Sequence, residues 1–238
     1  MRRILTFFLS FSVLIGLCGC SSKANKDHVI TFFDAFDKTL NLDSGHIVGT
    51  VTMINNKDTS KMHLDIQLDQ TKQVECALTL GLTANENHVD DYIDFYIHDG
   101  KTYLNNMGTK SQSKAENIGL AEGQKLAAYN PFLSYTDTEL ASVFTSSKKK
   151  EDVYTFTVDP SLLSTYLDEL GTVDIAKAEI KATIPDAYIT RLQIHIKGKQ
   201  TVYENTSDFD ITIEASLEDI NSLKGIDFPE DLDSYPTE

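Results

Sequence analysis

The sequence predicts a mainly β protein that is built on an antiparallel sheet, with a few helices beside it. The first observation is a period of two. It is clearest in KMHLDIQLD, residues 61–69, where Met62, Leu64, Ile66 and Leu68 alternate with polar residues. Such alternation indicates strands with one packed face and one wet face, as antiparallel sheets have. The second observation is that helices do not alternate regularly with these strands, which argues against a parallel sheet.

The period of two recurs along most of the chain. We expect about eight or nine strands, at residues 46–54, 61–69, 73–82, 90–98, 101–106, 152–159, 174–184, 188–198 and 208–218. The dipeptide Asp99-Gly100, between the fourth and fifth of them, is a two-residue hairpin signal. Residues 105–150 interrupt the pattern, and we expect NNMGTKSQSKAENIG and SSKKK within them to be polar loops.

Three segments have helical signals. Apolar residues at spacings of three and four predict a helix over residues 28–40. Thr136 and Glu139 form a capping box that starts a short helix. Asp159 as a cap, with Pro160 at the first helical position, predicts a helix over residues 160–170.

The N-terminus has the order of an export signal. Arg2 and Arg3 precede an apolar run, residues 4–17, which is shorter than the ~20 residues that span a bilayer. Leu17-Cys18-Gly19-Cys20 then resembles the lipobox of bacterial lipoproteins. The resemblance implies that Cys20 carries a diacylglyceryl group and becomes the first mature residue. The alternatives are an ordinary secretory signal and a Cys-x-Cys metal pair, which lacks nearby His or Cys residues to complete four ligands.

These features divide the chain into a signal peptide (1–19), a tether (20–26), a folded domain (27–228) and an acidic tail (229–238), whose end we expect to be disordered. They predict a protein held by its lipid anchor on the extracytoplasmic face of a cell membrane, and we favour a Gram-positive cell. Cys76 is the one other cysteine of the mature chain, and its place on an apolar strand face predicts a buried core thiol.

The charge of the chain excludes one class of partner. There are 36 acidic against 21 basic side chains, whereas binding to nucleic acid needs clustered Lys and Arg that neutralise phosphates. The same excess argues against electrostatic docking to anionic lipid. The acidity either serves solubility or captures a cation or a basic peptide.

The order of these elements resembles the LolA/LppX-like half-barrel lipoproteins. An amphipathic helix precedes a long antiparallel meander, the helix of TVDPSLLSTYLDEL interrupts it late, and strands around IPDAYITRLQIHI and DFDITIEASLEDIN close it. The resemblance implies a single curved antiparallel sheet, a half-barrel, with helices over its concave face. It also implies an apolar groove that holds a lipid or acyl chain in some members.

Motifs of catalysis, metal binding and cofactor binding give no site. Two Ser-x-x-Lys matches, at Ser111 and Ser147, lie in the expected polar loops and lack the companion motifs of acyl-serine enzymes. No zinc-protease helix motif or phosphate-binding glycine loop occurs. Asp90, Asp91 and Asp94 lack the ordered spacing of a calcium loop. We therefore expect no enzyme activity, no cofactor and no metal.

The function that the sequence favours is binding of a lipid or another hydrophobic ligand in an apolar groove. The alternative is an interaction protein of the cell envelope that docks another protein or a cation. The segment 105–150 is long for a connection inside a compact domain, and we expect it to form a lid over the groove. The residues expected to turn inward are Leu126, Tyr129, Phe132, Leu133 and Phe144, and the last four form our predicted ligand-binding set.

Overall fold

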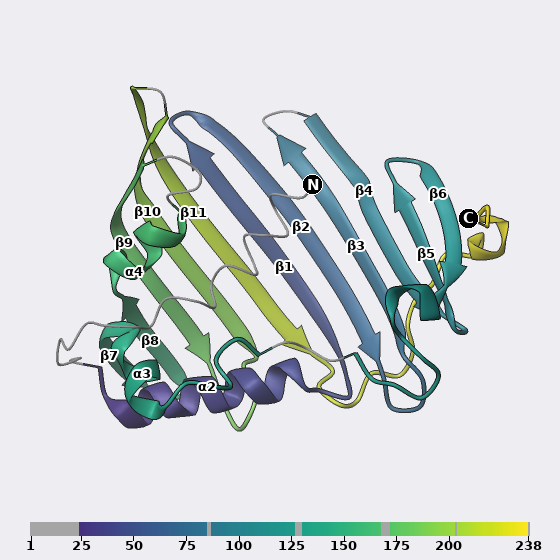
Figure 1. The fold of residues 1–238 in the computed structure, drawn as a ribbon, viewed down its shortest axis with the longest axis horizontal. Helices are drawn as coiled ribbons and strands as arrows, with labels where there is room; N and C mark the ends of the chain where they lie inside the picture. The colour runs from purple at the N-terminus through teal and green to yellow at the C-terminus, as the bar shows by residue number, and fades with distance from the viewer. Residues whose placement is uncertain (1–23, 85–86, 127–129, 168–171, 203, 238) are drawn as a thin grey trace. The chain divides into compact units, whose positions relative to one another are not determined.

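The computed structural model describes residues 24–84, 87–126, 130–167, 172–202 and 204–237. Eleven strands form one antiparallel sheet in the order β6-β5-β4-β3-β2-β1-β11-β10-β9-β8-β7 (Figure 1). Because β6 and β7 end this order without pairing with each other, the sheet is open. The predicted fold class, a mainly β half-barrel with a single antiparallel sheet, is confirmed.

The strands have the following bounds: β1 Ser44–Asn55, β2 Asp58–Asp69, β3 Glu75–Ala84, β4 Asn87–His98, β5 Lys101–Asn106, β6 Thr109–Lys114, β7 Phe144–Lys150, β8 Val153–Val158, β9 Thr172–Thr183, β10 Arg191–Val202 and β11 Asn205–Glu218. The helices are α2 Lys26–Leu40, α3 Asp137–Ser142 and α4 Pro160–Leu167, with short 3-10 turns η2 Ala115–Ile118 and η4 Leu232–Ser234. Within these described parts, no helix is long and apolar enough to cross a membrane.

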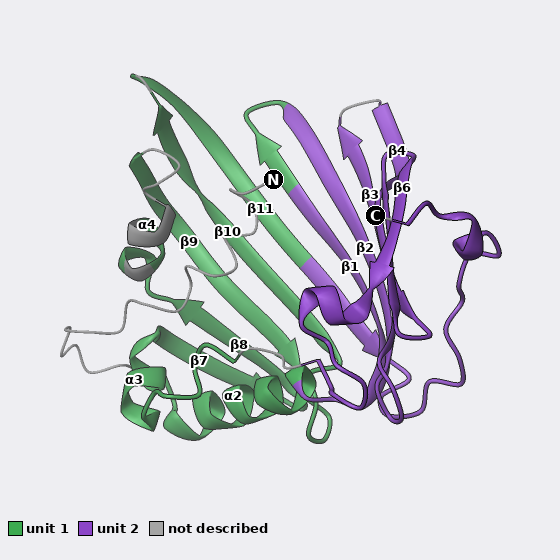
Figure 2. Ribbon diagram, turned by 45° about the vertical axis from the view of Figure 1, so that its right-hand side comes forward, with its two compact units in different colours: residues 1–40, 53–57, 129–213 green, residues 41–52, 58–128, 214–238 purple. Residues whose placement is uncertain are grey.

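The chain divides into two compact units (Figure 2). Unit 1 comprises residues 1–40, 53–57 and 129–213, and unit 2 comprises residues 41–52, 58–128 and 214–238. Strands β1 and β11 each contribute residues to both units. Each unit has a hydrophobic core of its own, and the two cores differ in what covers the sheet.

The core of unit 1 is built by helix α2 against strands β7 to β11. The apolar stripe of α2 brings Phe32 to 5.1 Å from Phe156 and 6.1 Å from Phe144, measured between ring centroids. Helix α3 packs beside α2, and its predicted capping box is present, since the Thr136 hydroxyl accepts from the Glu139 amide. Rings in such edge-on and tilted contacts add to the stability that their burial provides. In unit 1, helices therefore cover one sheet face.

The core of unit 2 lies on both faces of strands β2 to β5. One cluster contains Val74, Cys76 and Ile97, and the other contains Ala77, Tyr96 and Tyr103 together with Leu232 and Tyr235 from the C-terminal segment. Adjacent residues such as Cys76 and Ala77 point to opposite faces, so the two clusters lie on opposite sides of the sheet. Cys76 is buried as predicted, and burial raises the pKa of its thiol to about 11.

The C-terminal segment packs against the sheet, which differs from the disorder expected at its end. Leu232 and Tyr235 are buried, and the Gln112 amide donates to the Pro236 carbonyl oxygen at 2.8 Å. Thr237 then forms a parallel bridge with Gln112 of edge strand β6. The acidic composition of the tail concealed this packing in the sequence, because only Leu232 and Tyr235 among its described residues are buried, while Asp233 and Ser234 between them are exposed.

Two segments that we expected to be loops are edge strands. The sequence TKSQSK forms β6, which pairs with β5 through the turn at Met107 and Gly108, where φ is 48° and 86°. The lysine run after Phe144 forms β7, which pairs with β8. Edge strands need little apolar pattern, and lysine on an edge discourages pairing with another chain. The hairpin predicted at Asp99-Gly100 is confirmed, with φ values of 47° and 72°.

Candidate functional site

The candidate site is an apolar face on the strands of unit 2, which we call the leucine face. The register sets Leu64 opposite Leu80, and Leu80 opposite Ile93. A second row crosses Ile66, Leu78, Phe95 and Leu104 in the same way. A third joins Met62, Leu82 and Val89. Since strands lie ~4.8 Å apart, the four-strand row extends over ~14 Å. The leucine face is thus made of three rows of apolar side chains, with a register shift of β3 and β4 between the rows of Leu80 and Leu82.

Burial of the leucine face decreases along the strands. At one end, Cys76 and Ile97 are buried with Leu68 and Leu120 packed against them. In the rows beyond, the leucines and Ile93 are half-buried. At the margins, Val89 is 43% exposed and Leu104 is 39% exposed. Apolar side chains at such exposure leave free energy to be gained from further burial, about 25 cal/mol for each Å².

The two units differ in the helices that cover the apolar face of their strands. In unit 1, α2 and α3 lie over the apolar strand face. In unit 2, by contrast, the described residues contain no α-helix, and Leu120, which follows η2, packs against the buried end of the leucine face. A sheet face this apolar is normally packed against another layer. The leucine face is therefore the part of unit 2 that is suited to receive a hydrophobic ligand.

A cleft in unit 2 is lined mainly by polar side chains. It has a volume of 390 Å³ and is lined by His46, Gln67, Asp219, Leu223, Lys224, Gly225 and Asp227. His46 in its wall contacts the Asp65 carboxylate at 3.0 Å. The Asp227 amide donates to Gln67 at 3.0 Å. The wall groups are thus partly satisfied within the protein, and their polarity does not suit an acyl chain.

The predicted lid residues lie in different environments. Phe144 begins β7 and is 1% exposed in the core of unit 1, while Phe132 packs on Phe33 with 4.8 Å between ring centroids. Leu133 is 78% exposed, so it does not turn inward, and Leu126 is also exposed. Tyr129 lies outside the described residues. That these residues bind a ligand stays a prediction. Phe132 and Phe144 also contribute to the hydrophobic core of unit 1.

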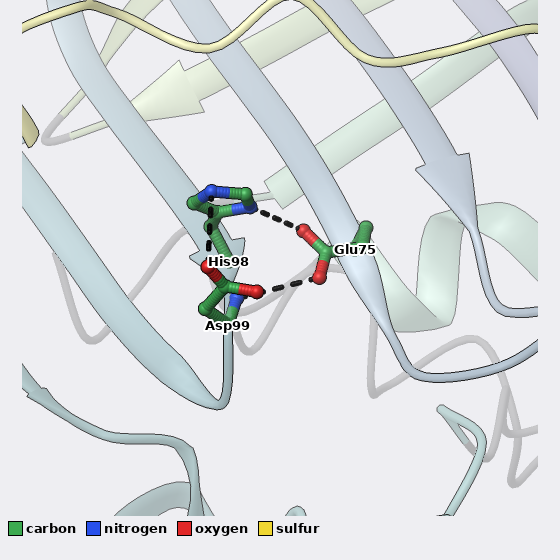
Figure 3. Close-up of side chains that lie close together, drawn as sticks. All are labelled: Glu75, His98 and Asp99. Carbon is green, nitrogen blue, oxygen red and sulfur yellow. Dashed lines mark hydrogen bonds and ion pairs between the residues drawn. The ribbon is translucent and has the colours of Figure 1, made fainter.

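A second cluster, which the sequence analysis missed, joins Glu75, His98 and Asp99 (Figure 3). His98 Nδ1 lies 2.6 Å from Glu75 Oε2, and His98 Nε2 lies 3.6 Å from Asp99 Oδ2. The register explains the contact, because Cys76 pairs with Ile97 and so Glu75 stands opposite His98. Asp99-Gly100 was recognised as a turn, yet only the strand pairing brings Glu75 to it.

The aspartates at residues 90, 91 and 94 are not gathered into a metal site in the described structure. Asp90 pairs with His88, with 2.5 Å between its Oδ1 and the ring Nε2. Asp94 is instead buried, and its Oδ2 accepts from Asn105 Nδ2 at 2.8 Å. Its Oδ1 has no hydrogen-bond partner. Burial is the main cause that raises the pKa of Asp94, and the negative charge of Asp91 adds to it.

Comparisons with known proteins add little to this geometry. No protein-family model matches the sequence, and no curated protein matches it. Among solved structures, the chain is similar to LprF from Mycobacterium bovis, with a TM-score of 0.40 and 13% sequence identity, over 87% of this chain and 99% of that one. A likeness at this level says nothing about what the present chain binds.

Proposed function

We propose that this protein is a membrane-anchored lipoprotein that binds a lipid or another hydrophobic ligand on the leucine face and carries out no enzymatic reaction. The observation that supports the proposal is the half-buried apolar face of unit 2, whose described residues contain no α-helix. The hydrocarbon part of the ligand would lie on the rows of Leu, Ile and Phe. The anchor would be the lipid on Cys20, which lies outside the described residues.

The rows restrict the chemistry of the ligand. Between β2 and β4 they contain only apolar side chains, including Leu64, Leu80 and Ile93. The first polar neighbours in register are Asn106, opposite Ile93, and Ser111, opposite Leu104. A ligand on this face therefore has an apolar body without buried polar groups, because an unpaired polar group costs free energy when it loses water.

The proposal is tested by organic extraction of the purified protein followed by mass spectrometry, and by titration with a fluorescent fatty acid. Leu104→Glu places a charge at the exposed margin of the leucine face, where it can stay hydrated in the free protein. We expect it to weaken fatty-acid binding by about tenfold or more, since the ligand must desolvate that charge. Met107→Glu is the matched control, because Met107 is 61% exposed at the turn of the same hairpin.

An extract without lipid, together with no fatty-acid binding by the unmodified protein, rules out the carrier. The second candidate, an envelope protein that docks another protein or a cation, would then stand. The distribution of charge favours it: unit 2 has 20 acidic against seven basic side chains, whereas unit 1 has 16 against 14. Nearly all of the net negative charge of the chain therefore belongs to unit 2.

A further inference from the structure

We propose that Glu75, His98 and Asp99 form a binding site for a divalent transition-metal ion such as zinc. The three side chains come from the start of β3, the end of β4 and the turn that follows β4. One potential ligand atom from each lies within 4.8 Å of the others. Zinc binds nitrogen and oxygen ligands at about 2.0–2.2 Å. To hold one ion, the exposed Asp99 side chain must turn from Nε2 of the ring toward Nδ1, and Nδ1 must move slightly apart from Glu75 Oε2.

The neighbours of the cluster hold two of its members in place. Gln73 Nε2 donates to Glu75 Oε1 at 2.5 Å, and the Asp99 amide donates to the same oxygen at 3.3 Å. Phe228 lies against the imidazole of His98, with 4.3 Å between ring centroids. Glu75 and His98 therefore have partners that restrict their rotation before an ion arrives, which lowers the cost of ordering them.

The ligand set selects the class of ion. One imidazole and two carboxylates suit zinc and its first-row neighbours, whereas calcium takes six to eight oxygen ligands. On binding, the ion would take the place of the hydrogen bond between His98 Nδ1 and Glu75 Oε2. Three protein ligands leave a fourth position of the zinc to water.

The other histidines do not offer the same arrangement. In the described structure, His46, His88 and His195 each contact a single carboxylate, of Asp65, Asp90 and Asp210 respectively. His195 shares Asp210 with Lys197, whose charge opposes a cation. Among the contacts between described residues, His98 is the histidine that meets two carboxylates.

The charge of the surroundings favours a cation at this site. All three residues belong to unit 2, with its excess of 13 acidic side chains. Such a field raises the local concentration of positive ions. Lys101, opposite His98 in the pairing of β4 with β5, acts in the other direction and limits the affinity. The site is separate from the leucine face, so the proposal does not depend on lipid binding.

The test is isothermal titration calorimetry of the full chain, purified without a histidine tag, with zinc chloride. We expect saturable binding of one ion and at least a tenfold weaker affinity in Asp99→Asn. Asn tolerates the positive φ of this turn position, so the variant should fold. His98→Ala should abolish binding, and the matched control His88→Ala, which alters the other end of β4, should not change it.

NMR of the histidine rings identifies the nitrogen that binds. Zinc should shift the His98 ring resonances first, at concentrations that leave the His88 and His195 rings unaffected. No saturable binding below about 1 mM zinc, or equal affinities of Asp99→Asn and the unmodified protein, would falsify the site and reduce the cluster to an ion pair.

Discussion

At the scale of single residues, Asp94 is a side chain whose environment conflicts with its charge. It is 4% exposed, one carboxylate oxygen is unpaired, and Tyr96 and Tyr235 are buried in the same unit. Desolvation favours the protonated form of such a group. Asp94 therefore costs stability whenever it is ionised, and a neutral replacement should reveal that cost through its pH dependence.

We predict that Asp94→Asn becomes increasingly favourable relative to the unmodified protein as the pH rises. Because the pKa of Asp94 is raised in the folded state, the carboxyl of the unfolded chain ionises first, near pH 4. Stability of the unmodified protein is then lost from about pH 4 upward until the folded-state pKa is passed, and it is lowest above that pKa. The neutral variant lacks this loss.

Urea unfolding of both proteins at about pH 3.5, 5 and 7 measures the difference in unfolding free energy. The difference should grow in favour of the variant with each step until the folded-state pKa is passed. A constant difference across the range would contradict the prediction. Asp58→Asn, at an exposed position of β2, is the control and should show no such trend.

At the scale of elements, the pairing of β9 with β10 depends on a glycine. The register shifts between Lys197 and Gly198, which marks a bulge. A Cβ atom at Gly198 would lie 2.3 Å from the carbonyl oxygen of Asp174 and 3.1 Å from the Cα of Ile175. These are backbone atoms of the neighbouring strand, so they cannot move aside as a flexible side chain would.

We therefore predict that Gly198→Ala destabilises the protein by about 1–3 kcal/mol, the usual cost of forcing extra atoms into a packed structure. The matched control is Gly225→Ala, since no atom lies within 4 Å of the Cβ that it would add. Urea unfolding compares the two variants with the unmodified protein. If Gly198→Ala and Gly225→Ala have the same midpoint, the close approach at the bulge has no energetic effect.

At the scale of the whole molecule, attachment to a membrane is predicted from the sequence alone. Residues 1–23 lie outside the described part of the chain. One acyl chain holds a protein only marginally, whereas the two chains of a diacylglyceryl group bind firmly, at ~0.8 kcal/mol for each buried methylene. The two chains on Cys20 would then be sufficient without a polybasic patch.

We predict that Cys20→Ser moves the protein from the membrane fraction to the soluble fraction or stalls it as an uncleaved precursor, and that Cys18→Ser leaves it in the membrane. Mass spectrometry of the membrane-extracted protein should show the loss of residues 1–19 and an acyl addition at Cys20. Cleaved Cys20→Ser protein that still sediments with membranes after a high-pH wash would show that another part of the chain holds it there.

Particular elements show how much of the fold followed from the sequence. The helix of residues 28–40, the capping box at Thr136 and the hairpin at Asp99-Gly100 were predicted correctly. Each is specified by side chains within a few residues of one another. Strands β6 and β7 were missed because an edge strand with little core contact needs no apolar alternation.

The sequence by itself determined the strands other than β6 and β7, the apolar face of those strands and the antiparallel pairing of the sheet, because these depend on a local period. Only the tertiary structure decided that Glu75 meets His98, that Asp94 is buried and that Tyr235 packs against Tyr103. These contacts depend on the register of strands and on residues more than a hundred positions apart. Many pairings satisfy the same local period, and the packing of the whole chain selects one of them.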